Sequence, residues 1–194
     1  MQESSVKGGY KMTKKVSVFL ADGFEEIEGL TVVDLLRRAG VEVTTVSITE
    51  KLTIHGAHKI DVQADKMFDE VNYQEEDMVV LPGGMPGTLN LGAHAGVKEV
   101  LEQFYEAKKY IGAICAAPSV LGKYGMLDRR KATSYPGFEE QLKGAEYTTE
   151  PVAVSDFVIT SRGLGTAIDF ALALIEVLVG EEKAKEISHS IIYR

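Results

Sequence analysis

The sequence has few of the residues that usually build metal centres. It contains one cysteine, Cys115, among 194 residues. A single cysteine excludes an internal disulfide framework and every zinc pattern that needs several cysteines. It is also what a reducing compartment permits, so we expect a cytoplasmic protein. The histidines show no convergent ligand set, so we expect no metal; they are His55, His58, His94 and His189.

Positive charge is scarce as well. The 21 Lys+Arg residues against 29 Asp+Glu residues leave a net charge of -8. Proteins that bind the phosphate backbone usually carry a basic face, and no basic cluster occurs along this chain. We therefore expect no nucleic-acid partner.

Long apolar runs are also missing. The most apolar stretch, 167–179, is interrupted by Asp169 and Glu176 and is too short to cross a bilayer. Residues 1–12 are polar and have no apolar core like that of a signal peptide. We expect no membrane partner, a disordered extension over residues 1–13, and a single domain over residues 14–194.

What the chain does have is the composition of a globular protein, with 45% hydrophobic residues. Short, nearly continuous apolar runs are each followed by glycine or another small residue. Such runs are typical of parallel strands that are covered on both faces of a sheet. The expected strands are 15–21, 41–48, 78–81, 110–114 and 157–160, with 131–134 as a further candidate.

Helical patterns separate these strands. Apolar residues recur at helical spacing over 27–39, 97–109 and 166–179. Alternation of strands and helices predicts an α/β fold with an open, mostly parallel sheet between helices. The segments 52–62 and 147–159 interrupt the alternation and read as short antiparallel additions.

Cys115 is the strongest candidate for a reactive residue in the sequence. In open α/β sheets, ligands bind beyond the carboxyl ends of the strands, and Cys115 directly follows the strand 110–114. Small neighbours, Ala113, Ala116 and Ala117, suit the tight strand-to-helix turn that presents a nucleophile. The following helix N-terminus favours a thiolate. The alternative is a small buried hydrophobic residue, the commonest fate of a free cysteine.

Two other loops end at the same edge of the predicted sheet. Gly83 and Gly84 follow the strand 78–81, where their N–H groups could join that of Ala116 in an oxyanion hole, although glycine pairs also make plain turns. Glu25, Glu26 and Glu28 open the first helix, where acids stabilise the helix dipole. One carboxyl that points inward would instead stay protonated beside the sulfur and move protons.

Four segments together carry a family resemblance over about residues 14–194: LADGFEEIE (20–28), VLPGG (80–84), AICAAP (113–118) and TSRGLGT (160–166). With them the chain resembles the ThiJ/PfpI superfamily, and most of all its parkinsonism-associated deglycase and bacterial YajL-like branch. The resemblance implies a flavodoxin-like three-layer sandwich, a homodimer and a cofactor-independent activity.

The resemblance also assigns roles to matching positions. Cys115 matches the family's reactive cysteine, and Glu28 matches the glutamate whose protonated carboxyl contacts it. Gly84 and Ala116 match the backbone donors beside the sulfur. Arg38 matches an arginine near the dimer interface. Gly83 and Glu25 would lie at the pocket edge.

One departure matters. Many members of the family place a histidine near the cysteine, either directly after it or in a loop before a proline. Here Ala116 follows the cysteine, and the loop carries Tyr135 before Pro136. Tyr135 could donate a hydrogen bond at the pocket edge or could simply pack in its loop.

The resemblance implies an enzyme of the glyoxalase III or deglycase type, in which Cys115 forms a hemithioacetal with a small reactive carbonyl and Glu28 shuttles protons. The alternative is an oxidative-stress sensor or chaperone in which Cys115 is oxidised to sulfinic acid. Peptide hydrolysis ranks third, because it needs the missing histidine.

Overall fold

The computed structural model describes residues 13–193. The expected disordered extension lies, apart from Thr13, outside the described residues. Among residues 13–193, no helix is both long and apolar enough to cross a bilayer.

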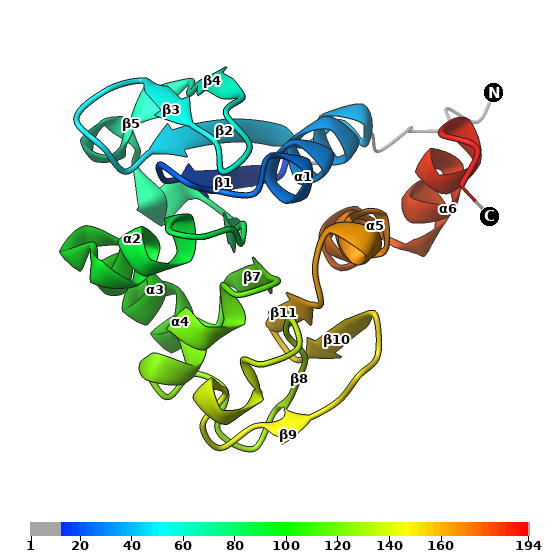
Figure 1. Ribbon diagram of the computed structural model, residues 1–194. Helices are drawn as coiled ribbons and strands as arrows, with labels where there is room; N and C mark the ends of the chain where they lie inside the picture. Colours follow the sequence, from blue (N-terminus) through cyan, green and yellow to red (C-terminus); the bar gives the residue numbers. More distant parts are fainter. Residues whose placement is uncertain (1–12, 194) are drawn as a thin grey trace, which may run out of the picture.

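A seven-stranded sheet forms the middle layer (Figure 1). All its pairings are parallel except the one at the β10 edge. In spatial order the strands are β10 (Val152–Ser155), β11 (Val158–Ser161), β7 (Tyr110–Ile114), β6 (Met78–Leu81), β1 (Lys15–Leu20), β2 (Glu42–Ser47) and β5 (Lys66–Met67). The predicted α/β class and mostly parallel sheet are therefore confirmed.

Helices cover both faces of the sheet, as a three-layer sandwich requires (Figure 1). One side holds α1 (Glu26–Arg38), α5 (Ala167–Val179) and α6 (Glu181–Ser190). The other holds α2 (Gly87–Ala93), α3 (Ala95–Glu106) and α4 (Pro118–Lys123). Short 3₁₀ turns occupy Phe68–Glu70, Tyr73–Glu75, Glu139–Gln141 and Leu164–Thr166.

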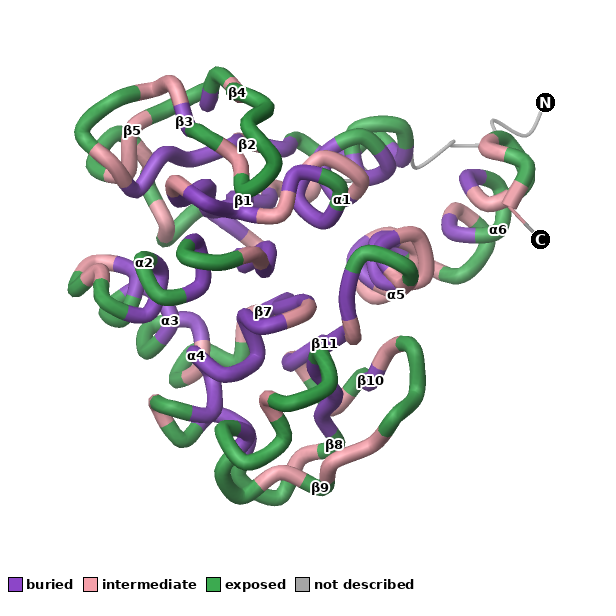
Figure 2. Tube along the Cα trace, viewed as in Figure 1, coloured by how far each residue is buried: buried purple, intermediate pink, exposed green. Residues whose placement is uncertain are grey.

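Each face of the sheet has its own apolar core, and the central strands β1, β6, β7 and β11 are almost wholly buried (Figure 2). Val18 and Phe170 lie in the core under α1 and α5, whereas Phe19 and Phe104 lie in the core under α3. Neighbouring residues of β1 thus contribute to opposite cores. This explains why the strands read as continuous apolar runs rather than as alternating patterns.

The predicted helix over 27–39 is confirmed as α1. Glu26 and Glu28 lie in its first turn and Arg37 and Arg38 in its last, so charge complements the helix dipole at both ends. Gly40 follows with φ 82°, a conformation that favours glycine and ends the helix.

The antiparallel additions are also confirmed. β3 (Thr53–His55) and β4 (Asp61–Gln63) form a separate hairpin, and β10 pairs with β11 around Asp156. Asp156 has φ 53°, which its short side chain tolerates.

The candidate strand over 131–134 is wrong as part of the main sheet. Only β8 (Lys131–Ala132) is extended, and it pairs with β9 (Glu146–Tyr147) in a small sheet of its own. The next residues leave the ladder because the Thr133 N–H donates to the side-chain hydroxyl of Thr160, at 2.9 Å. The chain is thereby led across the ends of β11 and β7.

Candidate active site

The carboxyl ends of β1, β6, β7 and β11 meet at one edge of the sheet, and Cys115 lies there directly after β7. Its φ of 66° places a non-glycine residue in the left-handed region, which costs about 1–3 kcal/mol. Two backbone hydrogen bonds fix it: its N–H donates to the Ser161 carbonyl at 3.0 Å, and its carbonyl accepts from the Tyr135 N–H at 2.8 Å. The predicted nucleophile turn is therefore present.

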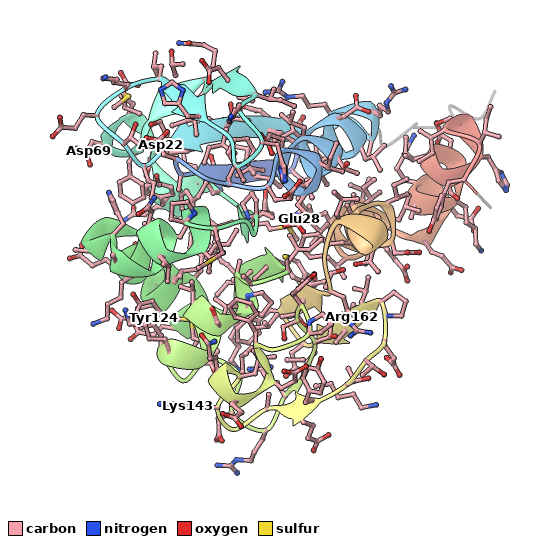
Figure 3. The ribbon with its side chains drawn as sticks, viewed as in Figure 1. Asp22, Glu28, Asp69, Tyr124, Lys143 and Arg162 are labelled. Atoms are coloured by element: carbon pink, nitrogen blue, oxygen red, sulfur yellow. The ribbon has the colours of Figure 1, made fainter. Side chains whose placement is uncertain are left out.

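Glu28 faces this cysteine from the first turns of α1. Its residue is only 1% exposed, and its Oε2 accepts the Gly83 N–H at 3.0 Å. The carboxyl is also hydrogen-bonded to the Cys115 side chain. In Figure 3 Glu28 lies between α1 and the end of β7. Of the three acids that open the helix, Glu28 is thus the one that reaches the sulfur.

Glycines lie where the loops close on this pair, and Gly83 has no room for a side chain. A Cβ on Gly83 would lie 2.5 Å from the Cys115 Cβ and 2.6 Å from Glu28 Oε2. A Cβ on Gly163 would lie 3.6 Å from Glu28 Oε1 and 3.8 Å from the Cys115 sulfur. The site is therefore walled by backbone rather than by side chains.

Backbone donors surround the sulfur as the family resemblance implies. The N–H groups of Ala116 and Gly84 both interact with the Cys115 side chain and stabilise its ionised form. Gly84 has φ 91°, and a Cβ there would overlap the backbone of Glu25. The glycine pair is thus more than a plain turn.

Burial dominates the ionisation of both groups. It raises the pKa of the Glu28 carboxyl from 4.5 to about 7, against hydrogen bonds from Cys115 and Gly83. It also raises the pKa of the Cys115 thiol to about 12, and the negative charge of Glu28 adds to the rise. The two groups are hydrogen-bonded to each other, so they titrate as a coupled pair and share a proton near neutral pH.

This differs from the expectation that the helix N-terminus would keep Cys115 as a thiolate. The helix that follows, α4, is short, and desolvation of the half-buried sulfur outweighs the two N–H donors.

Other predicted site residues take different places. Tyr135 is 52% exposed, and its ring would lie 3.3 Å from a Cβ on Gly163, which puts it at the pocket edge. Arg38 lies at the far end of α1 in an ion pair with Asp34 at 2.8 Å, and takes no part in the pocket. Glu25 lies near enough to raise the pKa of Glu28 by its charge.

Histidine is absent from the contacts of the pair. No interaction of residues 13–193 joins a histidine to Cys115 or Glu28. His94 caps α3 by accepting the Val97 N–H, while His58 faces Glu25 and Glu26. The sequence did not reveal the grouping of His58 with Glu25 and Glu26, because His58 lies 32 residues beyond Glu26 in a hairpin turn.

The model of the DJ-1/PfpI family matches residues 14–177. The chain belongs to this family. It is 37% identical over 183 residues to Protein dj-1beta of Drosophila melanogaster, covering 93% of this chain and 98% of that protein. It is 29% identical to the Glutathione-independent glyoxalase DJ-1 of Schizosaccharomyces pombe, covering 91% of this chain and 97% of that protein.

Length differs among the relatives. The chain spans 42% and 47% of Arabidopsis thaliana Protein DJ-1 homologs B and A, to which it is 34% and 35% identical over 94% of its own length. Among solved structures, oxidized Toxoplasma gondii DJ-1 superposes with a TM-score of 0.90 at 38% identity, covering 93% of this chain and 99% of that one. Drosophila melanogaster DJ-1beta superposes with a TM-score of 0.91 at 36% identity, covering 94% of this chain and 100% of that one.

Proposed function

We propose that this member of the DJ-1/PfpI family is a cofactor-independent cysteine enzyme that converts small reactive carbonyls, of the glyoxalase III or protein deglycase type. The observation that carries the proposal is the pairing of Cys115 with a buried carboxyl whose pKa is raised to about 7. Such a carboxyl is suited to exchange protons at neutral pH. The name of the Schizosaccharomyces pombe relative, a glyoxalase, supports the same reaction class.

The first step would be addition to a 2-oxoaldehyde such as methylglyoxal. Ionised Glu28 takes the thiol proton as the Cys115 sulfur bonds to the aldehyde carbon. The carbonyl π electrons move onto oxygen, where the N–H groups of Gly84 and Ala116 would stabilise the negative charge. Glu28 then returns the proton to that oxygen, which gives a neutral hemithioacetal.

The second stage moves hydrogen between carbons. Ionised Glu28 removes the proton from the former aldehyde carbon, and the neighbouring ketone becomes an enediolate. Glu28 protonates the adjacent carbon, and the proton of the former aldehyde hydroxyl moves to the neighbouring oxygen, which gives a thioester of the hydroxy acid. Water then cleaves the carbon–sulfur bond, so that one methylglyoxal and one water yield lactate and the free thiol. In a deglycase reaction the product released would be the repaired amine or thiol.

Replacement of the sulfur tests the proposal. Purified wild-type protein should form lactate from methylglyoxal without glutathione, and Cys115→Ala protein with an unchanged circular dichroism spectrum should form none above the uncatalysed rate. Equal lactate formation by both proteins would contradict a mechanism that depends on Cys115.

A second candidate is oxidative sensing at the same sulfur. It is favoured by the partial exposure of Cys115 and by the relative that was solved in an oxidized form. Two molecules of hydrogen peroxide would convert the thiol to a sulfinic acid and give two waters. A stable gain of two oxygens at Cys115 after mild peroxide treatment, without carbonyl turnover, would favour sensing over catalysis. Peptide hydrolysis is not proposed, because the pair contacts no histidine.

We further propose that the chain acts in the cytoplasm as a homodimer without nucleic-acid or membrane partners. Apolar side chains left partly uncovered on α5, such as Ile168 and Leu172, and the 96% exposed Ile192 support a second copy. The mass in solution tests this, because a monomer at micromolar concentration would contradict it.

A further inference from the structure

Three metal-ligating side chains converge at the start of α1, outside the contacts of Cys115. His58 Nδ1 lies 3.3 Å from Glu25 Oε2 and 3.1 Å from Glu26 Oε2. The three ligand atoms all lie within 4.8 Å of one another. They come from two separate elements, because His58 lies in the turn between β3 and β4.

The fold holds one of these ligands rigidly. Glu26 is 2% exposed, and its Oε1 accepts the N–H groups of His58 at 2.8 Å and Ile60 at 3.3 Å. With Oε1 occupied, Oε2 faces the imidazole and is hydrogen-bonded to its Nδ1 at 3.1 Å, so a cation bound here would take the place of the shared proton. Gly56 lets the hairpin approach this closely, since a Cβ there would overlap the Glu26 carboxyl. The Ala57 N–H donates to the Phe24 carbonyl at 2.9 Å and ties the hairpin down a second time.

His58 is the cationic side chain that faces the two carboxylates, which also lie at the positive end of the α1 dipole. The side chains of Glu25 and Glu26 are only 14% and 2% exposed, and His58 is the ion-pair partner of both. Within residues 13–193 neither carboxylate pairs with a lysine or an arginine. One imidazole carries at most one positive charge, so the rest of the negative charge is offset by the α1 dipole and by the N–H groups of His58 and Ile60 rather than by a second cation. A divalent cation would balance both carboxylates.

We propose that Glu25, Glu26 and His58 bind one divalent cation of the zinc type. Ligand atoms about 2.0–2.1 Å from a tetrahedral ion lie roughly 3.3 Å from one another, close to the two separations from the imidazole nitrogen. A mixed nitrogen and oxygen set suits zinc, whereas calcium and magnesium take oxygen ligands. The His58 side chain is 67% exposed, so water can complete the coordination. This proposal does not depend on the function of Cys115.

Zinc titration of the untagged full-length chain tests the site. We use a Cys115→Ala background so that the thiol cannot supply a competing ligand. Calorimetry should report one bound zinc ion per chain. Glu25→Gln and His58→Ala should each weaken binding by at least about tenfold, because losing a ligand costs no less than losing its outer-shell partner. Glu26 is left unchanged, since its carboxyl also holds the hairpin.

A matched control lies on the same hairpin. His55 is 60% exposed and pairs with Asp61 at 2.7 Å, away from the three ligands. His55→Ala should bind zinc as tightly as the parent protein. Cobalt as a probe should give the strong visible absorption of a four-coordinate ion, and His58→Ala should lose it. Absence of zinc binding in the parent protein, unchanged binding in His58→Ala, or equal weakening in His55→Ala would overturn the site. Circular dichroism confirms that each variant is folded.

Discussion

Replacing Glu28 by glutamine separates its two effects on the cysteine. The amide keeps the shape of the side chain, but it has no negative charge and cannot accept the thiol proton. The nearby charge of Glu28 helps to raise the pKa of the Cys115 thiol, so removing that charge should lower this pKa. Burial, the larger cause, remains, and the pKa should therefore stay above the ordinary value of 9.0.

Turnover should fall even though the thiol becomes more acidic. Without the carboxylate no group takes the thiol proton or transfers hydrogen between carbons, and kcat/KM should fall about 10²–10⁴-fold. That loss corresponds to about 3–5 kcal/mol of transition-state stabilisation. A variant with a more acidic thiol and a slower reaction distinguishes proton transfer from simple thiolate activation.

The thiol pKa and the rate of lactate formation are measured on the same preparation. The ultraviolet absorbance of the thiolate against pH reports the Cys115 pKa, and lactate formation reports turnover. Asp34→Asn is the matched control, because Asp34 lies on the same helix in an exposed ion pair with Arg38. It should leave both values unchanged. Proton transfer by Glu28 should raise kcat/KM at least 10²-fold. A kcat/KM of Glu28→Gln within about threefold of wild type would therefore refute the role of Glu28 as a proton carrier.

The remaining predictions concern pH, close packing and the core. Since ionised Glu28 must take the thiol proton and its pKa is raised to about 7, kcat/KM should fall roughly tenfold per pH unit below that value; a rate independent of pH from 5 to 7 would contradict this. Gly83→Ala should lower kcat/KM by about 10²-fold through displacement of the pair, whereas Gly165→Ala, which meets nothing within 4 Å, should not. Phe104→Ala, at a residue 2% exposed, should cost about 3–5 kcal/mol of unfolding free energy by urea denaturation; a loss under 1 kcal/mol would show that the core there is loose.

Much of the fold could be predicted from the sequence, because burial on both faces leaves a local pattern. The run 78–81 is wholly apolar, and every residue of β6 is buried. Segment 131–134 could not be placed, since its hydrogen bond to the Thr160 side chain depends on a partner 27 residues away.

The positions of the candidate site residues could be predicted from the sequence, but their ionisation could not. Positions after strands predicted Cys115 and Gly83, and the family resemblance singled out Glu28 from its neighbours. The direction of the thiol pKa depends on how deeply the turn is buried, which no local pattern reveals. The grouping of His58 with Glu25 and Glu26 depends on how the hairpin packs on α1.

The most direct test of the proposed reaction is the mass of the protein during a single turnover. Wild-type enzyme in excess over methylglyoxal, quenched at successive times, should show a gain of one substrate mass on the peptide that contains Cys115. This adduct should appear before lactate and decay as lactate forms. Lactate that forms with no adduct on Cys115, or an adduct that persists while no lactate appears, would contradict the account.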